Sequence, residues 1–70
     1  MDREPVRSSS IKSVGYDPAT LSLEVEFEDS TVYVYSDIRQ DVRDEFIAAE
    51  SKGSFFNMRI KDQYAFRRVP

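Results

Sequence analysis

Residues 21–35 read LSLEVEFEDSTVYVY, and this stretch decides the fold class. Apolar side chains at the odd positions from 21 to 27 alternate with polar ones, the period-two pattern of a half-buried strand. A polar break follows, and residues 31–35 are β-branched or aromatic, as strands favour. The stretch therefore predicts an antiparallel hairpin with one face in the core.

The length of the hairpin loop decides which face carries Tyr33 and Tyr35. A two-residue loop, Asp29-Ser30, would pair Val25 with Val34 and leave both tyrosines outside, as a stacking platform for RNA bases. A three-residue loop, residues 28–30, would bring them to the core side. We expect the second register, because two tyrosines bury more apolar area than two valines.

The segments beside the hairpin complete the sheet and add helices. Ile11 to Tyr16 predicts a first strand, which Asp17-Pro18 ends in a turn. Asp37 with Gln40 resembles a capping box and predicts a helix from about Ile38.

Two residues in the second half divide it into two helices. Gly53 predicts the end of the first helix, and Ser54 predicts the cap of a shorter second one. The chain from Tyr64 onward is expected to be extended and to lie back over the sheet.

The predicted fold is α+β, in the order β-β-β-α-α: a three-stranded antiparallel sheet with both helices packed on one face. Residues 1–9 are expected to form a flexible lead, and residues 10–70 a single domain. The apolar positions of these elements predict a core of Ile11, Leu21, Leu23, Val25, Phe27, Val42, Phe46, Phe56 and Ile60.

The composition argues against most catalytic chemistry. The 70 residues include neither cysteine nor histidine, which removes thiol nucleophiles, the commonest general base and the commonest transition-metal ligand. Glu24, Glu26 and Glu28 alternate along one strand, and we interpret them as a solvated face because an open face gives all three the same water, whereas a catalytic pair of carboxylates needs unequal environments. No enzyme activity, metal or cofactor is expected.

Charge is unevenly distributed along the chain. Residues 1–51 hold twelve acids and five bases, a balance of −7, while residues 52–70 hold five bases and one acid, a balance of +4. No apolar run reaches the length of a membrane span, and the charged N-terminus is followed by no hydrophobic segment. We expect a cytoplasmic protein without a membrane partner.

The segment from Ser10 to Tyr64 resembles the KTSC domain, a family named after a C-terminal extension of some lysyl-tRNA synthetases and also found as small free-standing proteins. Two departures stand out: Ser30 occupies a position where a turn glycine is common, and Arg39 one where proline is common. The residues that carry the resemblance are Ser10-Ile11, Val14–Pro18, Leu23–Phe27, Tyr33–Tyr35, Ala49, Ser51–Gly53, Phe56-Asn57, Ile60 and Tyr64.

The resemblance implies a small accessory module, and its association with a tRNA-charging enzyme suggests contact with RNA or tRNA. Such contact would use the basic C-terminal third, and the candidate residues are Arg59, Lys61, Arg67 and Arg68. The alternative is a protein–protein module that docks on a larger enzyme or self-associates. With either function, the chain is expected to be a monomer or a weak dimer.

A third possibility is a small-molecule or peptide site built from the residues of the family motif. These candidates are Tyr16, Tyr33, Tyr35, Ser51, Gly53, Asn57 and Tyr64.

Overall fold

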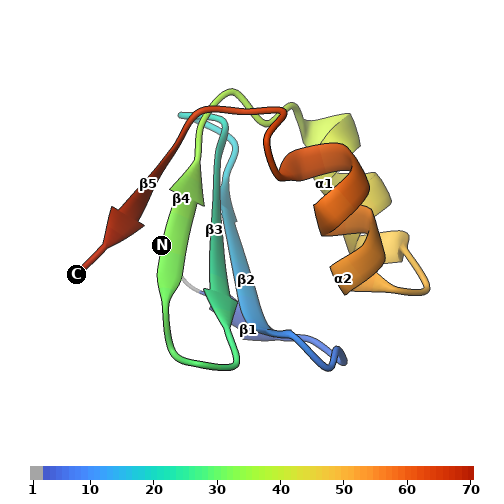
Figure 1. Cartoon of the computed structure of the whole chain (residues 1–70). Coiled ribbons are helices and arrows are strands. Elements are labelled where there is room, and N and C mark those ends of the chain that lie inside the picture. The colour runs from blue at the N-terminus through green and yellow to red at the C-terminus, as the bar shows by residue number, and fades with distance from the viewer. Residues whose placement is uncertain (1–2) are drawn as a thin grey trace.

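A computed structural model of the chain describes residues 3–70. Across these residues, five antiparallel strands form one sheet in the order β1-β2-β3-β4-β5, and both helices pack on one face of it (Figure 1). The helices are α1 and α2, and α2 continues into a π-helical turn, η1. The bounds are β1 Arg3–Pro5, β2 Ile11–Asp17, β3 Ser22–Phe27, β4 Val32–Tyr35, α1 Gln40–Ala48, α2 Lys52–Phe55, η1 Phe56–Ile60 and β5 Phe66–Val69.

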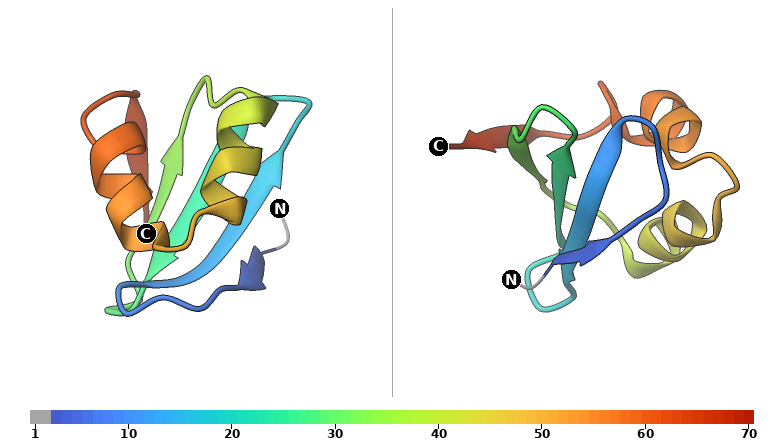
Figure 2. Two further views of the ribbon diagram at one scale, coloured as in Figure 1. Left: turned by 90° about the vertical axis from the view of Figure 1, so that its right-hand side faces the viewer. Right: turned by 90° about the horizontal axis from the view of Figure 1, so that it is seen from below.

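The prediction of three strands was wrong, because the sheet has one further strand at each edge. β1 lies in the segment expected to be a flexible lead, and β5 pairs beside β4 instead of lying over the sheet (Figure 2). Neither strand shows apolar alternation, so backbone hydrogen bonding to an existing edge places them. Residues 1 and 2 of the expected lead lie outside the described residues.

The hairpin takes the three-residue register. Val25 pairs with Tyr33 and Leu23 with Tyr35, and the Phe27 amide donates to the Thr31 carbonyl oxygen at 2.9 Å. Ser30 closes the loop with φ 70°, the left-handed residue that such loops require. Both tyrosines therefore lie on the helix-covered face, as expected, and the alternative with both on the open face is wrong.

A β-bulge in β2 places more apolar side chains in the core than alternation predicts. Ile11 pairs with Phe27, but the next pair is Ser13 with Glu26, so the register shifts between them. The shift brings Ile11 and Val14 to the same face although they are three residues apart, and both are buried.

The core confirms most of the predicted positions, and Phe27 and Val42 pack at its margin. The prediction was wrong for Leu21, which is 36% exposed, because its φ of 57° breaks the alternation just before β3. The buried core cluster is Ile11, Val14, Leu23, Val25, Tyr35, Ile38, Phe46, Phe56 and Ile60.

The first helix begins later than the capping box predicts. The Ile38 amide donates to the Leu21 carbonyl oxygen at 2.9 Å, and the Ile38 carbonyl oxygen accepts from the Tyr16 hydroxyl at 2.6 Å. These bonds hold residue 38 against the sheet, and Asp37 has φ 61°. Helix α1 therefore starts at Gln40, with Arg39 as an N-cap that makes no side-chain hydrogen bond.

The first helix also ends earlier than predicted. Ala49 is extended, with ψ 138°, and Gly53 lies inside α2 instead of ending α1. Ser51, not Ser54, caps the second helix: its hydroxyl oxygen accepts from the Ser54 amide at 3.3 Å. The predicted common face of Phe56 and Ile60 is confirmed, because both side chains are buried.

Candidate functional site

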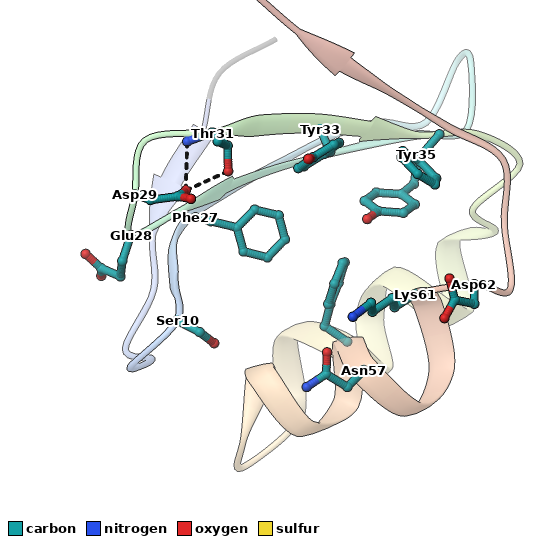
Figure 3. A pocket seen from close by; sticks show the side chains of 12 residues that line it. Ser10, Phe27, Glu28, Asp29, Thr31, Tyr33, Tyr35, Asn57, Lys61 and Asp62 are labelled. Atoms are coloured by element: carbon teal, nitrogen blue, oxygen red, sulfur yellow. Dashed lines mark hydrogen bonds between the residues drawn. The ribbon is translucent and has the colours of Figure 1, made fainter.

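A groove opens between the helix side of the sheet and the η1 turn, with a volume of about 550 Å³. That volume falls within the range of small-molecule and side-chain pockets. Figure 3 shows Tyr33 and Tyr35 pointing from β4 toward the helix that carries Asn57 and Lys61. The lining residues are Ser10, Phe27, Glu28, Asp29, Thr31, Tyr33, Tyr35, Phe56, Asn57, Lys61, Asp62 and Phe66.

Aromatic rings from three strands and one helix form the floor of the groove. The Tyr33 ring centroid lies 5.8 Å from Phe27 and 5.6 Å from Phe66, and the Tyr35 centroid lies 5.3 Å from Phe56, all edge-to-face. Each such contact contributes about 0.5–1.5 kcal/mol beyond burial. The floor is therefore a mutually packed surface, and the one ring in it that is mainly exposed is Phe66.

Tyr35 presents a polar atom at this apolar surface, and its hydroxyl keeps contact with solvent in the groove. Its side chain belongs to the core, at 5% exposure, and among residues 3–70 no group hydrogen-bonds its hydroxyl or that of Tyr33. Burial raises the pKa of Tyr35 above its usual 10.0, and Tyr33 and Asp62 raise it further. The phenol thus stays protonated and can both donate and accept.

Charged side chains stand at both ends of the groove (Figure 3). Glu28 and Asp29 lie at the hairpin end. The Asp29 carboxylate accepts from the Thr31 hydroxyl at 2.6 Å and the Thr31 amide at 3.1 Å, and these bonds lower its pKa. At the other end, Lys61 and Asp62 follow η1, and Asp62 has φ 64°.

The π-helical turn aligns the helix wall of the groove. The Lys61 amide donates to the Phe56 carbonyl oxygen, five residues earlier, at 2.8 Å. Phe56 and Ile60 face the core, while Asn57 and Lys61, the next residue of each, line the groove. Single π turns of this kind are frequent at functional sites.

Four of the family-motif residues support the fold and do not line the groove. Tyr16 bonds Ile38, and the Arg43 guanidinium lies 4.9 Å from its ring centroid. Ser51 caps α2 and Tyr64 packs at the margin of the core. Gly53 lets α2 approach the β1–β2 connection, since a Cβ there would lie 2.8 Å from Ser10 Oγ.

The four basic candidates are not brought together on one face. Arg59 pairs with Glu45 at 3.6 Å and stacks on Phe55 at 5.3 Å, whereas Lys61 lines the groove. Arg67 and Arg68 are successive residues of β5, so they point to opposite faces of the sheet.

The three glutamates also separate, contrary to the expected common solvated face. Arg3 of β1 lies 3.0 Å from Glu24 and 3.9 Å from Glu26. Glu26 also accepts from the Ser13 hydroxyl at 2.7 Å. Glu28 instead lies in the hairpin loop at the mouth of the groove. β1 supplies the base that alternation in β3 alone could not reveal.

Sequence reasoning missed two thirds of this site. Of the twelve lining residues, Tyr33, Tyr35, Asn57 and Lys61 were candidates and the other eight were not. The expected three-residue register puts Phe27 on the same face as Tyr33, so that residue could have been found. No sequence pattern brings Ser10 to the same groove as Asp62 and Phe66, because they lie far apart in the chain.

These features define a small α+β domain with an aromatic groove between a five-stranded sheet and a π-turned helix. A sequence profile of the KTSC domain matches residues 7–64, and the chain belongs to this family. A crystal structure of a KTSC domain protein from Yersinia pestis superposes with a TM-score of 0.96 at 38% identity, covering 99% of this chain and 97% of that one.

Two kinds of relatives share the sequence. An uncharacterised protein of Stutzerimonas stutzeri is 39% identical over 70 residues, which are 99% of each chain. A lysine–tRNA ligase of a Nostoc species is 34% identical over 61 residues, which are 87% of this chain and 11% of that enzyme. The domain therefore occurs both alone and as a small part of a tRNA ligase.

Within residues 3–70, no group of three or more acidic side chains is placed to hold a metal ion, and no helix is both long and apolar enough to cross a bilayer.

Proposed function

We propose that this KTSC domain is a non-catalytic binding module whose aromatic groove receives a segment of a protein partner. The observation that carries the proposal is the aromatic floor, in which the Tyr35 side chain is 5% exposed and its hydroxyl has no hydrogen-bond partner among residues 3–70 but keeps contact with solvent in the groove. A ligand group that bonds this hydroxyl would replace water there, and apolar surface of the ligand would be buried against the rings.

A protein segment fits the groove better than RNA does. The lining holds three acids against one base, and the whole chain has a net charge of −3, so phosphate groups would be repelled. Tyrosine and phenylalanine are enriched in protein interfaces, and β5 leaves one backbone edge of the sheet unpaired within the described residues. The match to a segment of tRNA ligases supports an accessory role beside a larger protein.

RNA contact remains the second candidate, because Lys61 lies in the groove and Arg68 is on the β5 strand beside it. Binding to labelled tRNA would be mainly electrostatic, would weaken steeply with salt and would be nearly abolished by Arg67→Glu with Arg68→Glu. We expect the module, built on residues 10–70, to act in the cytoplasm as a monomer or weak dimer.

Cross-linking from inside the groove tests the proposal. Phe66 is replaced by the photoreactive p-benzoylphenylalanine, lysate is irradiated with and without nuclease, and the adducts are identified. We expect one dominant protein adduct that nuclease does not remove. Met58, which is 75% exposed and does not line the groove, is the matched control position and should not form it.

Two results would contradict the proposal. Adducts that disappear with nuclease would favour RNA, and equal adducts from positions 58 and 66 would show that the groove is not the contact surface. In a pull-down with protein that carries no photoreactive residue, Phe66→Ser should weaken recovery of the same partner more than Met58→Ser does.

A further inference from the structure

We infer that the group this groove receives is a cation, the side chain of an arginine or lysine in an extended partner segment. The inference rests on the proposed function and specifies its ligand chemistry. Three independent features lead to it: the charge of the lining, the aromatic floor, and hydrogen-bond acceptors that the fold leaves unused.

The lining is acidic, and its charges are separated. Glu28, Asp29 and Asp62 oppose only Lys61, a balance of −2. Lys61 lies beside Asp62 at one end, so the hairpin end has two carboxylates and no base in the lining (Figure 3). Arg68, which lines an adjoining depression with Thr31, offsets part of the Asp29 charge. The potential in the groove therefore attracts cations.

The floor suits the long stem of a basic side chain. Arginine and lysine bury their methylene groups along apolar surface while the charged head stays at a polar rim. Aromatic faces also attract a guanidinium or ammonium group, by about 0.5–1 kcal/mol at exposed sites. This protein already uses that contact twice, at Arg43 over Tyr16 and Arg59 over Phe55.

Two carboxylates and a phenol oxygen are available as acceptors. Within residues 3–70, neither Glu28 nor Asp62 accepts a side-chain hydrogen bond or forms an ion pair, in contrast to Glu24, Glu26 and Asp29. The Tyr35 side chain, which is 5% exposed, lies between these two ends of the groove (Figure 3). A guanidinium carries several donors in a rigid plane, and a bond to an ionised acceptor is about twice as strong as a neutral one.

Asp62 occupies a backbone conformation that suits this role. Its φ of 64° is a left-handed geometry that aspartate and asparagine tolerate better than other side chains. The variant Asp62→Asn therefore removes the charge while it keeps the local backbone. Glu28→Gln does the same in the hairpin loop.

A peptide titration followed by NMR tests the inference. The probes are acetyl-Gly-Ser-X-Ser-Gly-amide peptides in which X is arginine, its neutral isostere citrulline, or norleucine. Asn57 is the only asparagine of the chain and lines the groove, so its side-chain amide is a single, assignable reporter. Gln40, at the start of α1, is the internal reference.

We expect the arginine peptide to shift the Asn57 amide saturably, with an affinity about five- to tenfold above that of citrulline and norleucine, equivalent to about 1–1.4 kcal/mol. The double variant Glu28→Gln with Asp62→Asn should remove that preference at an unchanged melting temperature. Glu50→Gln, an exposed acid outside the groove, should leave it intact.

The outcomes separate this inference from the proposed function. Equal binding of citrulline or norleucine, or an arginine preference that survives the double variant, would overturn the cation and leave the groove as a binding site. An Asn57 amide unmoved by all three peptides would also overturn it. The cross-linking result decides independently whether the groove contacts a protein.

Discussion

At the scale of single residues, four non-glycine positions within residues 3–70 adopt positive φ: Leu21, Ser30, Asp37 and Asp62. Two of them are aspartates, which tolerate this conformation, but a leucine or serine there costs about 1–2 kcal/mol. Leu21 takes this conformation where the chain reverses into β3, and its carbonyl oxygen accepts a hydrogen bond from the Ile38 amide. The left-handed backbone turns the Leu21 side chain out of the alternation, which explains why it leaves the core despite its apolar pattern.

At both departures from the family pattern, the backbone has a conformation that suits the residue common in the family. Restoring that residue should therefore stabilise the protein. Ser30 has φ 70°, which glycine adopts freely, and Arg39 has φ −68°, which matches the proline ring. We expect Ser30→Gly and Arg39→Pro each to raise the free energy of unfolding by about 0.4–1 kcal/mol. Urea denaturation measures both, with Ser9→Gly as the control.

The prediction for Arg39→Pro would fail if this substitution lowered the free energy of unfolding. That result would show that the Arg39 amide or its ion pair with Asp41, 3.4 Å apart and exposed, matters more than the backbone fit.

At the scale of elements, the helix from Lys52 to Ile60 positions one wall of the groove through two features. The π turn aligns Asn57 with Lys61, and Gly53 allows a close approach to the segment that carries Ser10. A β-carbon at residue 53 would meet two serine hydroxyls, Ser10 Oγ at 2.8 Å and Ser8 Oγ at 3.9 Å, and the close one is the movable end of an exposed side chain. The contact is therefore tight but adjustable.

A double-mutant cycle tests this contact. Alanine favours a helix over glycine by about 1 kcal/mol, and the 2.8 Å contact with Ser10 Oγ offsets that gain. We expect Gly53→Ala to be nearly neutral alone and to stabilise by about 0.5–1 kcal/mol when Ser10→Ala removes the hydroxyl. Thermal unfolding of the four proteins measures the coupling. An equal effect of Gly53→Ala in both backgrounds would show that Ser10 does not restrict this position.

At the scale of the whole molecule, β5 is an edge strand of the sheet, and it carries two successive arginines, Arg67 and Arg68. The position of β5 at the edge explains these two charges without RNA binding. Antiparallel pairing of β5 with a second copy about its centre would set Arg67 opposite Arg68. Like charges directly opposite each other are destabilising, and charged edge strands limit association in natural sheets. We therefore expect the two arginines to act against self-association.

Neutralising this edge should promote dimers. We expect Arg67→Thr with Arg68→Thr to shift the protein from monomer toward dimer, measured by sedimentation equilibrium over a range of concentrations. Arg7→Thr with Lys12→Thr makes the same change in charge away from β5 and should leave the monomer unchanged. A monomeric β5 variant at every concentration would show that edge charge does not control assembly.

The sequence by itself determined the central hairpin and the helical second half, and it favoured the three-residue register over the two-residue one without deciding between them. Alternation in residues 21–27 and the aromatic content of β4 depend on local geometry and burial, so they are visible in one segment. The true start of α1 was not visible, because bonds from Tyr16 and Leu21 hold Ile38 against the sheet.

Only the tertiary structure decided the outer strands and the groove. β1 and β5 form because β2 and β4 offer unpaired backbone edges, and their own side chains show no strand pattern. The groove joins Ser10, Glu28 and Phe66 from three distant segments. Contacts between residues far apart in sequence depend on how the elements pack, and no local periodicity encodes that packing.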